Sequence, residues 1–258
     1  MTETSPDRSP SAIEHSLTLD ILRGRYAAGS RLPTVRELAE QHGVNPTTIQ
    51  RAVSRLETRG LVTARQGSGL RVNDPAECGD ISLVPQWLEV TLDQPTRAAG
   101  ILADLLEMRR ALAGRLLLRH RVAILARLPA LQQAAQRVRR AQGDPDAVRD
   151  ADLAFSRELL RAAGNVVALS VFNTVARVLV ELPLVSAAMY AAPEENVASM
   201  AQVLGALAGG GEDAGAVIEG AIAAIDARTV ARFEASLQAR RGEAGPAAAQ
   251  GLSVGVRA

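Results

Sequence analysis

The chain has 258 residues, of which 47% are hydrophobic and 2% aromatic, and its formal net charge is +1. Its 29 cationic side chains are all arginines, and it has one cysteine and three histidines. An internal disulfide framework is excluded, and no lysine is present for a Schiff base, a pyridoxal phosphate anchor or a Walker-type phosphate loop. The sequence shows no signal peptide and no apolar run of the roughly 18 residues that a membrane span needs, so we expect a cytoplasmic protein without a membrane partner.

Positive charge is concentrated near the N-terminus. Residues 23–71 contain nine arginines against three glutamates, a local net charge of +6, whereas residues 72–258 have a net charge of −2. A basic module followed by a larger, nearly neutral module predicts that polyanion binding is confined to one end of the chain.

The first two helices are predicted from apolar spacing and from capping residues. Apolar residues between 13 and 22 predict a first helix that ends near Gly24. Thr34 is a candidate N-cap, and Glu37, three residues later, completes a capping box that begins a second helix. Gly43 is expected to end this helix.

A third helix and a hairpin follow. Asn45 and Pro46 are an N-cap and a first-turn proline, and Gly60 ends the helix. The segments 61–65 and 70–72 predict two strands of a basic hairpin, which we call the wing. The inward face of the third helix is apolar and consists of Ile49, Ala52, Val53 and Leu56. Its opposite side carries donors that suit base edges and phosphates, namely Thr47, Gln50, Arg51, Ser54, Arg55 and Thr58.

This ordered set of motifs resembles the winged-helix domain of GntR-type bacterial transcription regulators. The resemblance covers about residues 13–72 and rests on the segments 31–39, 43–44, 47–48, 56–57, 60–62 and 66–69. In that family an arginine of the second helix, the start of the third helix and a wing glycine contact DNA. Together with the polar face of the third helix, the resemblance implies DNA binding by Arg36, Asn45, Thr47, Thr48, Gln50, Arg51, Arg55, Arg65 and Gly67.

Two positions of the third helix depart from the family pattern. Pro46 and Gln50 stand where many members with a helical effector domain have arginine. Because glutamine pairs with adenine and arginine with guanine, we expect an operator that differs from the one common in that group.

The remainder of the chain is predicted to be helical. With the winged helix-turn-helix at residues 11–73, we expect a linker at 74–97 with one short helix around 84–91. An all-helical effector-binding and dimerisation domain then covers 98–240, and 241–258 form a disordered tail. The predicted fold class is mainly α. Helices are expected at 98–120, 131–142, 145–163, 166–179, 194–207 and 213–237, with a further short helix that follows 179 and ends at 190.

Two motifs in this part, residues 105–112 and 152–165, resemble the all-helical FCD-type effector domain of the FadR subfamily. Many members bind a divalent metal through the aspartate of the second motif and three histidines. Here Asp152 remains, but Ser156 replaces the first histidine, and no histidine follows His120. We therefore expect no metal and no cofactor. The candidate effector-binding residues are Arg109, Asp152, Ser156 and Asn173; alternatively, Arg109 and Asp152 only pair with each other.

These observations predict a sequence-specific transcription regulator, expected to be a repressor, that binds an inverted-repeat operator in double-stranded DNA as a homodimer. A small-molecule effector would modulate it. Apolar walls with Arg109 favour an aliphatic organic acid, and the resemblance to the metal-free, fatty-acid-responsive branch of the FadR subfamily implies an acyl-CoA. Two alternatives are a ligand-independent architectural DNA-binding protein and an enzyme fused to a GntR domain. The known fusion, to an aminotransferase-like domain, needs a catalytic lysine that this chain lacks, so no enzyme is expected.

Overall fold

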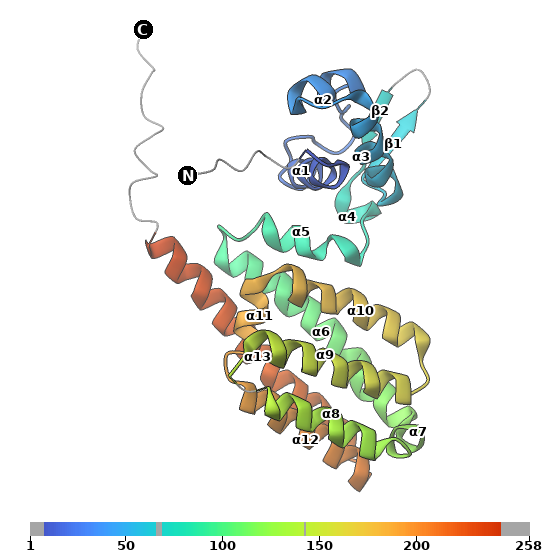
Figure 1. Cartoon of the computed structure of the whole chain (residues 1–258), viewed down its shortest axis with the longest axis vertical. Coiled ribbons are helices and arrows are strands. Elements are labelled where there is room, and N and C mark those ends of the chain that lie inside the picture. The colour runs from blue at the N-terminus through green and yellow to red at the C-terminus, as the bar shows by residue number, and fades with distance from the viewer. Residues whose placement is uncertain (1–7, 66–68, 142, 244–258) are drawn as a thin grey trace. The chain divides into compact units, whose positions relative to one another are not determined.

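The computed structural model describes residues 8–65, 69–141 and 143–243, and the chain divides into two compact units, residues 1–90 and 91–258 (Figure 1). The described part is mainly helical and contains one two-stranded antiparallel sheet. The predicted fold class, a winged helix-turn-helix followed by an all-helical unit, is confirmed. The first unit contains α1 (Pro10–Leu22), α2 (Val35–His42), α3 (Pro46–Thr58), β1 (Val62–Arg65), β2 (Gly69–Val72), α4 (Pro75–Cys78), η1 (Ile81–Leu83) and α5 (Val84–Glu89).

The helix boundaries of the first unit follow from local capping chemistry. The Thr34 hydroxyl accepts from the Glu37 amide at 3.3 Å, and the Glu37 carboxylate accepts from the Thr34 amide at 2.7 Å. The predicted capping box is therefore formed. Gly43 ends α2 with a φ of 62°, a left-handed conformation that glycine adopts without steric cost. Asn45 then caps α3 by accepting from the Thr48 amide at 2.9 Å.

One hydrophobic core joins α1, α2, α3 and the sheet. Leu17, Leu38, Ile49 and Leu56 are fully buried in it. The predicted inward face of α3 is thus the buried one, and its polar side is turned outward. Burial of this stripe fixes the rotation of α3 about its axis, which decides which side chains a partner can reach.

The segment expected to be a linker is largely folded. It forms α4, η1 and α5, and Leu83 belongs to the core of the first unit with 1% of its surface exposed. The Arg59 guanidinium donates to Glu14 at 2.6 Å, to the Ser82 carbonyl at 3.1 Å and to Gln86 at 3.0 Å. This arginine therefore ties α1, η1 and α5 together, so residues 74–90 belong to the first unit and 91–97 to the second.

The second unit is built from eight described helices. α13 packs against α6, α11 and α12, while α9 packs against α8 and α10. α7 was not predicted, and α13 continues to Glu243, so residues 241–243 of the expected tail are helical; the rest of that tail lies outside the described residues. The helices are α6 (Pro95–Arg119), α7 (Arg121–Leu125), α8 (Leu128–Arg140), α9 (Pro145–Ala162), α10 (Val166–Glu181), α11 (Pro183–Met189), α12 (Pro193–Gly209) and α13 (Ala214–Glu243).

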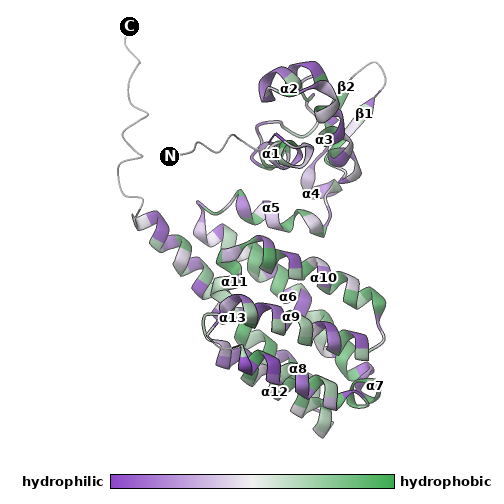
Figure 2. Cartoon of the chain, viewed as in Figure 1, coloured by the Kyte–Doolittle hydropathy of each residue, from purple (hydrophilic) through white to green (hydrophobic). Residues whose placement is uncertain are grey.

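Figure 2 shows that α10 is hydrophobic over much of its length. Among the described residues, no single helix is both long and apolar enough to cross a membrane. The segments Val166–Val178 and Pro183–Met189 reach that length and composition only when taken together, and they meet at a bend of 104°.

Candidate functional sites

The outward side of α3 presents polar side chains at its N-terminal half. Thr47, Gln50 and Arg51 are exposed, while their neighbours Ile49 and Ala52 are buried. In the part of the chain that the structure describes, neither Gln50 nor Arg51 has a hydrogen-bond or ion-pair partner. These two side chains are therefore free to contact a ligand that approaches α3 from outside.

Four other predicted DNA-binding residues already have partners within the unit. Arg36 forms an exposed ion pair with Glu40 at 3.3 Å. The Asn45 carboxamide oxygen accepts from both the amide and the hydroxyl of Thr48, each at 2.9 Å, so these two side chains maintain the α3 cap. Arg55 donates to the Ser11 hydroxyl. A contact with DNA would have to compete with these bonds or share them.

The wing is anchored to the end of α3. β1 and β2 pair in antiparallel register, with Val62 opposite Val72 and Arg65 opposite Gly69. The Glu57 carboxylate accepts from the Ala64 amide at 3.0 Å, which holds β1 against α3. Arg65 is exposed on β1. The predicted wing contact Gly67 lies outside the described residues.

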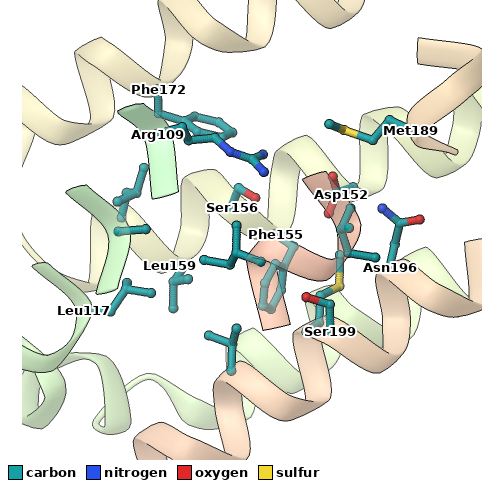
Figure 3. Close-up of a pocket in the computed structure, with 16 residues that line it drawn as sticks. Arg109, Leu117, Asp152, Phe155, Ser156, Leu159, Phe172, Met189, Asn196 and Ser199 are labelled. Atoms are coloured by element: carbon teal, nitrogen blue, oxygen red, sulfur yellow. The ribbon is translucent and has the colours of Figure 1, made fainter. Parts of the chain in front are cut away.

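A second candidate site is a cavity of about 150 Å³ inside the helical unit (Figure 3). Arg109, Asp152 and Ser156, three of the four predicted effector-binding residues, line it. Asn173 does not line it: its side chain is exposed and accepts from Arg157 at 3.0 Å. The preceding residue, Phe172, lines the cavity instead, so Asn173 lies one helical position, or about 100° of rotation, away from it.

The two charged residues of the cavity are held by partners that the sequence did not indicate. Arg109 forms an ion pair with Asp226, and Arg110 contacts the same carboxylate at 3.1 Å. Asp152 accepts a hydrogen bond from the Tyr190 hydroxyl at 2.7 Å. The alternative in which Arg109 and Asp152 only pair with each other is therefore replaced by two separate interactions.

Sequence reasoning missed Asn196, a polar residue of α12 that lines the cavity. It is 6% exposed, and its carboxamide oxygen has no hydrogen-bond partner in the structure. The Arg109 Nε is also buried without a partner. Asn196 shares the buried face of α12 with Met200, Val203 and Leu207, so its helical phase was the available signal.

The donor set of the cavity does not fit a divalent metal of the kind that the FCD resemblance implies. The cavity offers one carboxylate, two serine hydroxyls and one carboxamide, and no imidazole. Within the described ranges, no group of three or more His, Cys, Asp and Glu side chains is placed to hold a metal ion. Affinity and selectivity for transition metals depend on nitrogen and sulfur donors, such as the imidazole of histidine and the thiolate of cysteine.

Stability should depend on pH through Asp152. Burial raises the pKa of this carboxyl above its ordinary value of 3.8, against the opposing effects of the Tyr190 hydrogen bond and the Arg109 charge. The folded state therefore binds the proton more tightly than the unfolded state. The contribution of Asp152 to the free energy of unfolding is thus fully present below the unfolded pKa and falls as pH rises through the folded pKa.

Asp152→Asn cannot ionise and keeps an acceptor for Tyr190. We expect this variant to be more stable than wild type near neutral pH, with a difference that shrinks as pH falls and vanishes only well below the ordinary pKa of 3.8, where the wild-type carboxyl is protonated in both states. Urea unfolding across this range measures the difference. An equal difference in the free energy of unfolding at every pH would show that ionisation of Asp152 does not cause the difference.

Two family models match the chain. "Bacterial regulatory proteins, gntR family" matches residues 10–72, and "FCD domain" matches residues 104–218. An uncharacterized HTH-type transcriptional regulator of Mycobacterium tuberculosis is 34% identical over 154 residues, which are 56% of this chain and 57% of that protein. A fatty acid metabolism regulator protein of Vibrio vulnificus is 31% identical over 103 residues, 40% of this chain and 36% of that protein.

The alignments thus span about half, or less, of the length of these curated relatives. Among solved structures, that of Lar, which controls the expression of the Listeria monocytogenes agr system, is 18% identical. It covers 85% of this chain and 95% of that chain with a TM-score of 0.48.

Proposed function

Because this chain joins a DNA-binding domain of the GntR family to an FCD domain, we propose that it is a transcription regulator whose binding to operator DNA is modulated by a small-molecule effector. These domains are those of a regulator and not of an enzyme. The winged helix-turn-helix would bind the operator, and the cavity of the helical unit would bind the effector.

The observation that carries this proposal is the exposed, unpartnered face of α3. Gln50 and Arg51 project from the N-terminal half of the helix that a helix-turn-helix protein inserts into the major groove. Arg51 can donate two hydrogen bonds to a guanine or contact a phosphate, and Gln50 can pair with an adenine edge. Arg65 on the wing adds an exposed cation to the same unit, which favours phosphate contact.

The finer features of the proposal follow from the symmetry of operators. A helix-turn-helix usually recognises two half-sites about one helical turn apart, so we propose a homodimer on an inverted repeat. We further propose that the protein acts as a repressor in the cytoplasm. An effector that binds the DNA-released conformer more tightly would then lower operator occupancy. A ligand-independent architectural protein would not use the cavity described above.

Changing Arg51 to alanine tests the docking of α3. If Arg51 contacts a base, we expect operator affinity to fall about 5- to 150-fold, the equivalent of roughly 1–3 kcal/mol, and specificity at that base pair to relax. If it contacts a phosphate, binding to all sequences should weaken evenly and the salt dependence should decrease by about one charge. Fluorescence anisotropy with an operator selected from random DNA, at several salt concentrations, separates the two results.

The matched control is Arg25→Ala. Arg25 is an exposed arginine of the same unit, pairs with Asp20 at 3.1 Å and lies outside α3. This control should bind the selected operator like wild type. Wild-type affinity of Arg51→Ala for the operator at moderate salt would contradict the proposed docking.

A further inference from the structure

We infer that the cavity of the helical unit takes a compact, uncharged organic molecule of roughly six to ten non-hydrogen atoms, with an apolar body and a hydroxyl or amide head group. The inference rests on the proposed function, since it names the chemical class of the proposed effector. It departs from the acyl-CoA or organic acid expected from the sequence. The volume, the unpaired polar atoms and the charge balance of the cavity each support it.

The cavity is small. Its volume of about 150 Å³ matches that of an engineered apolar cavity that binds benzene. Pockets that hold drug-sized ligands are larger, roughly 300–1,000 Å³. A long acyl chain with a coenzyme A head group would need several times this volume, whereas a ring or a short branched chain fits.

The cavity has an apolar end and a polar end. Figure 3 shows Leu117 and Leu159 on one side, and Arg109, Ser156, Asp152 and Asn196 toward the other. The rest of the wall is largely aromatic, aliphatic or thioether: Ala113, Phe155, Leu160, Phe172, Met189, Met200, Val203, Ile222 and Ile225. This division suits an amphipathic molecule whose body contacts the apolar walls and whose head group faces Asn196.

The polar end lacks hydrogen-bond partners of both kinds. The Asn196 oxygen is a buried acceptor without a donor, and the Arg109 Nε is a buried donor without an acceptor. Leaving such groups unpaired costs free energy, which a ligand recovers by pairing them. A hydroxyl or a primary amide both donates and accepts, so it can pair with an atom of either kind. A carboxylate only accepts, and an ammonium group only donates.

The charges around the polar end are already balanced. Arg109 and Arg110 share Asp226, and the carboxyl of Asp152 accepts a hydrogen bond from the Tyr190 hydroxyl. Two cations thus face two potential anions. A ligand carboxylate would add a negative charge near Asp152, and an ammonium group would add a positive charge near Arg109. Either would leave an uncompensated charge in a poorly solvated site.

Two sets of probes with constant shape and variable charge test the inference on the full-length protein. The first set is benzamide, benzoate and benzylamine; the second is isovaleramide, isovalerate and isoamylamine. Palmitoyl-CoA serves as the long-chain probe. We expect calorimetric titration at neutral pH to show at least one amide binding about tenfold or more tightly than its acid and its amine. Palmitoyl-CoA should not compete with that amide.

Substitutions locate the binding. Asn196→Ala should weaken binding of the amide about tenfold, as expected for the loss of one buried hydrogen bond, and Ser156→Ala provides a second variant on another helix. Asn173→Ala is the matched control, because Asn173 is exposed outside the cavity, and it should bind the amide like wild type. Circular dichroism verifies that each variant is folded.

Several results would overturn the inference. One is that an acid, an amine or palmitoyl-CoA binds more tightly than both amides. Another is that neither amide binds, and a third is that neither Asn196→Ala nor Ser156→Ala changes the binding of the amide. Operator binding is measured on the same preparations without ligand. If the wild type binds DNA sequence-specifically and any of these results is found, only the ligand class is rejected. If the wild type shows no sequence-specific DNA binding, the proposed function is rejected.

Discussion

Asp226→Ala is expected to lower the free energy of unfolding of the helical unit by about 3 kcal/mol, the lower end of the range for breaking a buried ion pair. The Asp226 side chain is 4% exposed and contacts the guanidinium groups of both Arg109 and Arg110. Its removal leaves two neighbouring cations without a counter-charge. The loss stays at the lower end because these arginine side chains are 24% and 27% exposed and are therefore partly solvated.

Chemical denaturation followed by circular dichroism measures this loss. Asp104→Ala is the control, since Asp104 is an exposed acid on α6 and should change stability by less than about 0.5 kcal/mol. Asp226→Ala combined with Arg110→Ala should recover part of the loss, because it removes one of the two unpaired cations. A loss below about 1 kcal/mol for Asp226→Ala alone would mean that the ion pair contributes no more than an exposed one.

Leu56→Ala should destabilise the DNA-binding unit by about 2–5 kcal/mol, the range for truncating a fully buried leucine. Leu56 has no exposed surface and lies in the core between α3, the other helices of this unit and the sheet. The cavity left behind loosens the helix that presents Gln50 and Arg51. Operator affinity should therefore fall although no DNA-facing side chain has changed.

Differential scanning calorimetry separates this effect from damage to the whole chain. Because the two units have separate cores, the transition of the first unit should move to lower temperature while that of the helical unit stays in place. Thr58→Ala, an exposed change on the same helix, is the control and should move neither transition appreciably. Equal shifts of both transitions after Leu56→Ala would contradict separate cores.

The parts of the fold that were predictable depend on chemistry between near neighbours in sequence. Thr34 and Glu37 are three residues apart, and Asn45 and Thr48 are also three apart, so the caps of α2 and α3 can be inferred from spacing alone. The buried and exposed sides of α3 follow from the spacing of its apolar residues, which recur every three to four positions, about one helical turn. α7 has only five residues and starts directly after His120, the residue that ends α6, so it is too short to show a helical spacing of its own.

The cavity was less predictable because its contacts join residues that are distant in sequence. Arg109 and Asp226 are 117 positions apart, and Tyr190 and Asp152 are 38 apart. Periodicity places a residue on a face but does not say which helix that face meets. Asn173 lies one position away from the residue of α10 that lines the cavity, whereas Asn196 occupied a buried position whose partner helices could not be known.

The Arg59 bonds to Glu14, Ser82 and Gln86 determine how this protein can be divided for experiments. A fragment that stops at Val72, where the family match ends, would lack Leu83 from its core and would leave Arg59 without its bonding partners Ser82 in η1 and Gln86 in α5. Such a truncation should be poorly soluble and prone to proteolysis. A recombinant DNA-binding fragment that is to fold independently must extend at least to Glu89, whose carboxylate also meets His15 at 3.1 Å.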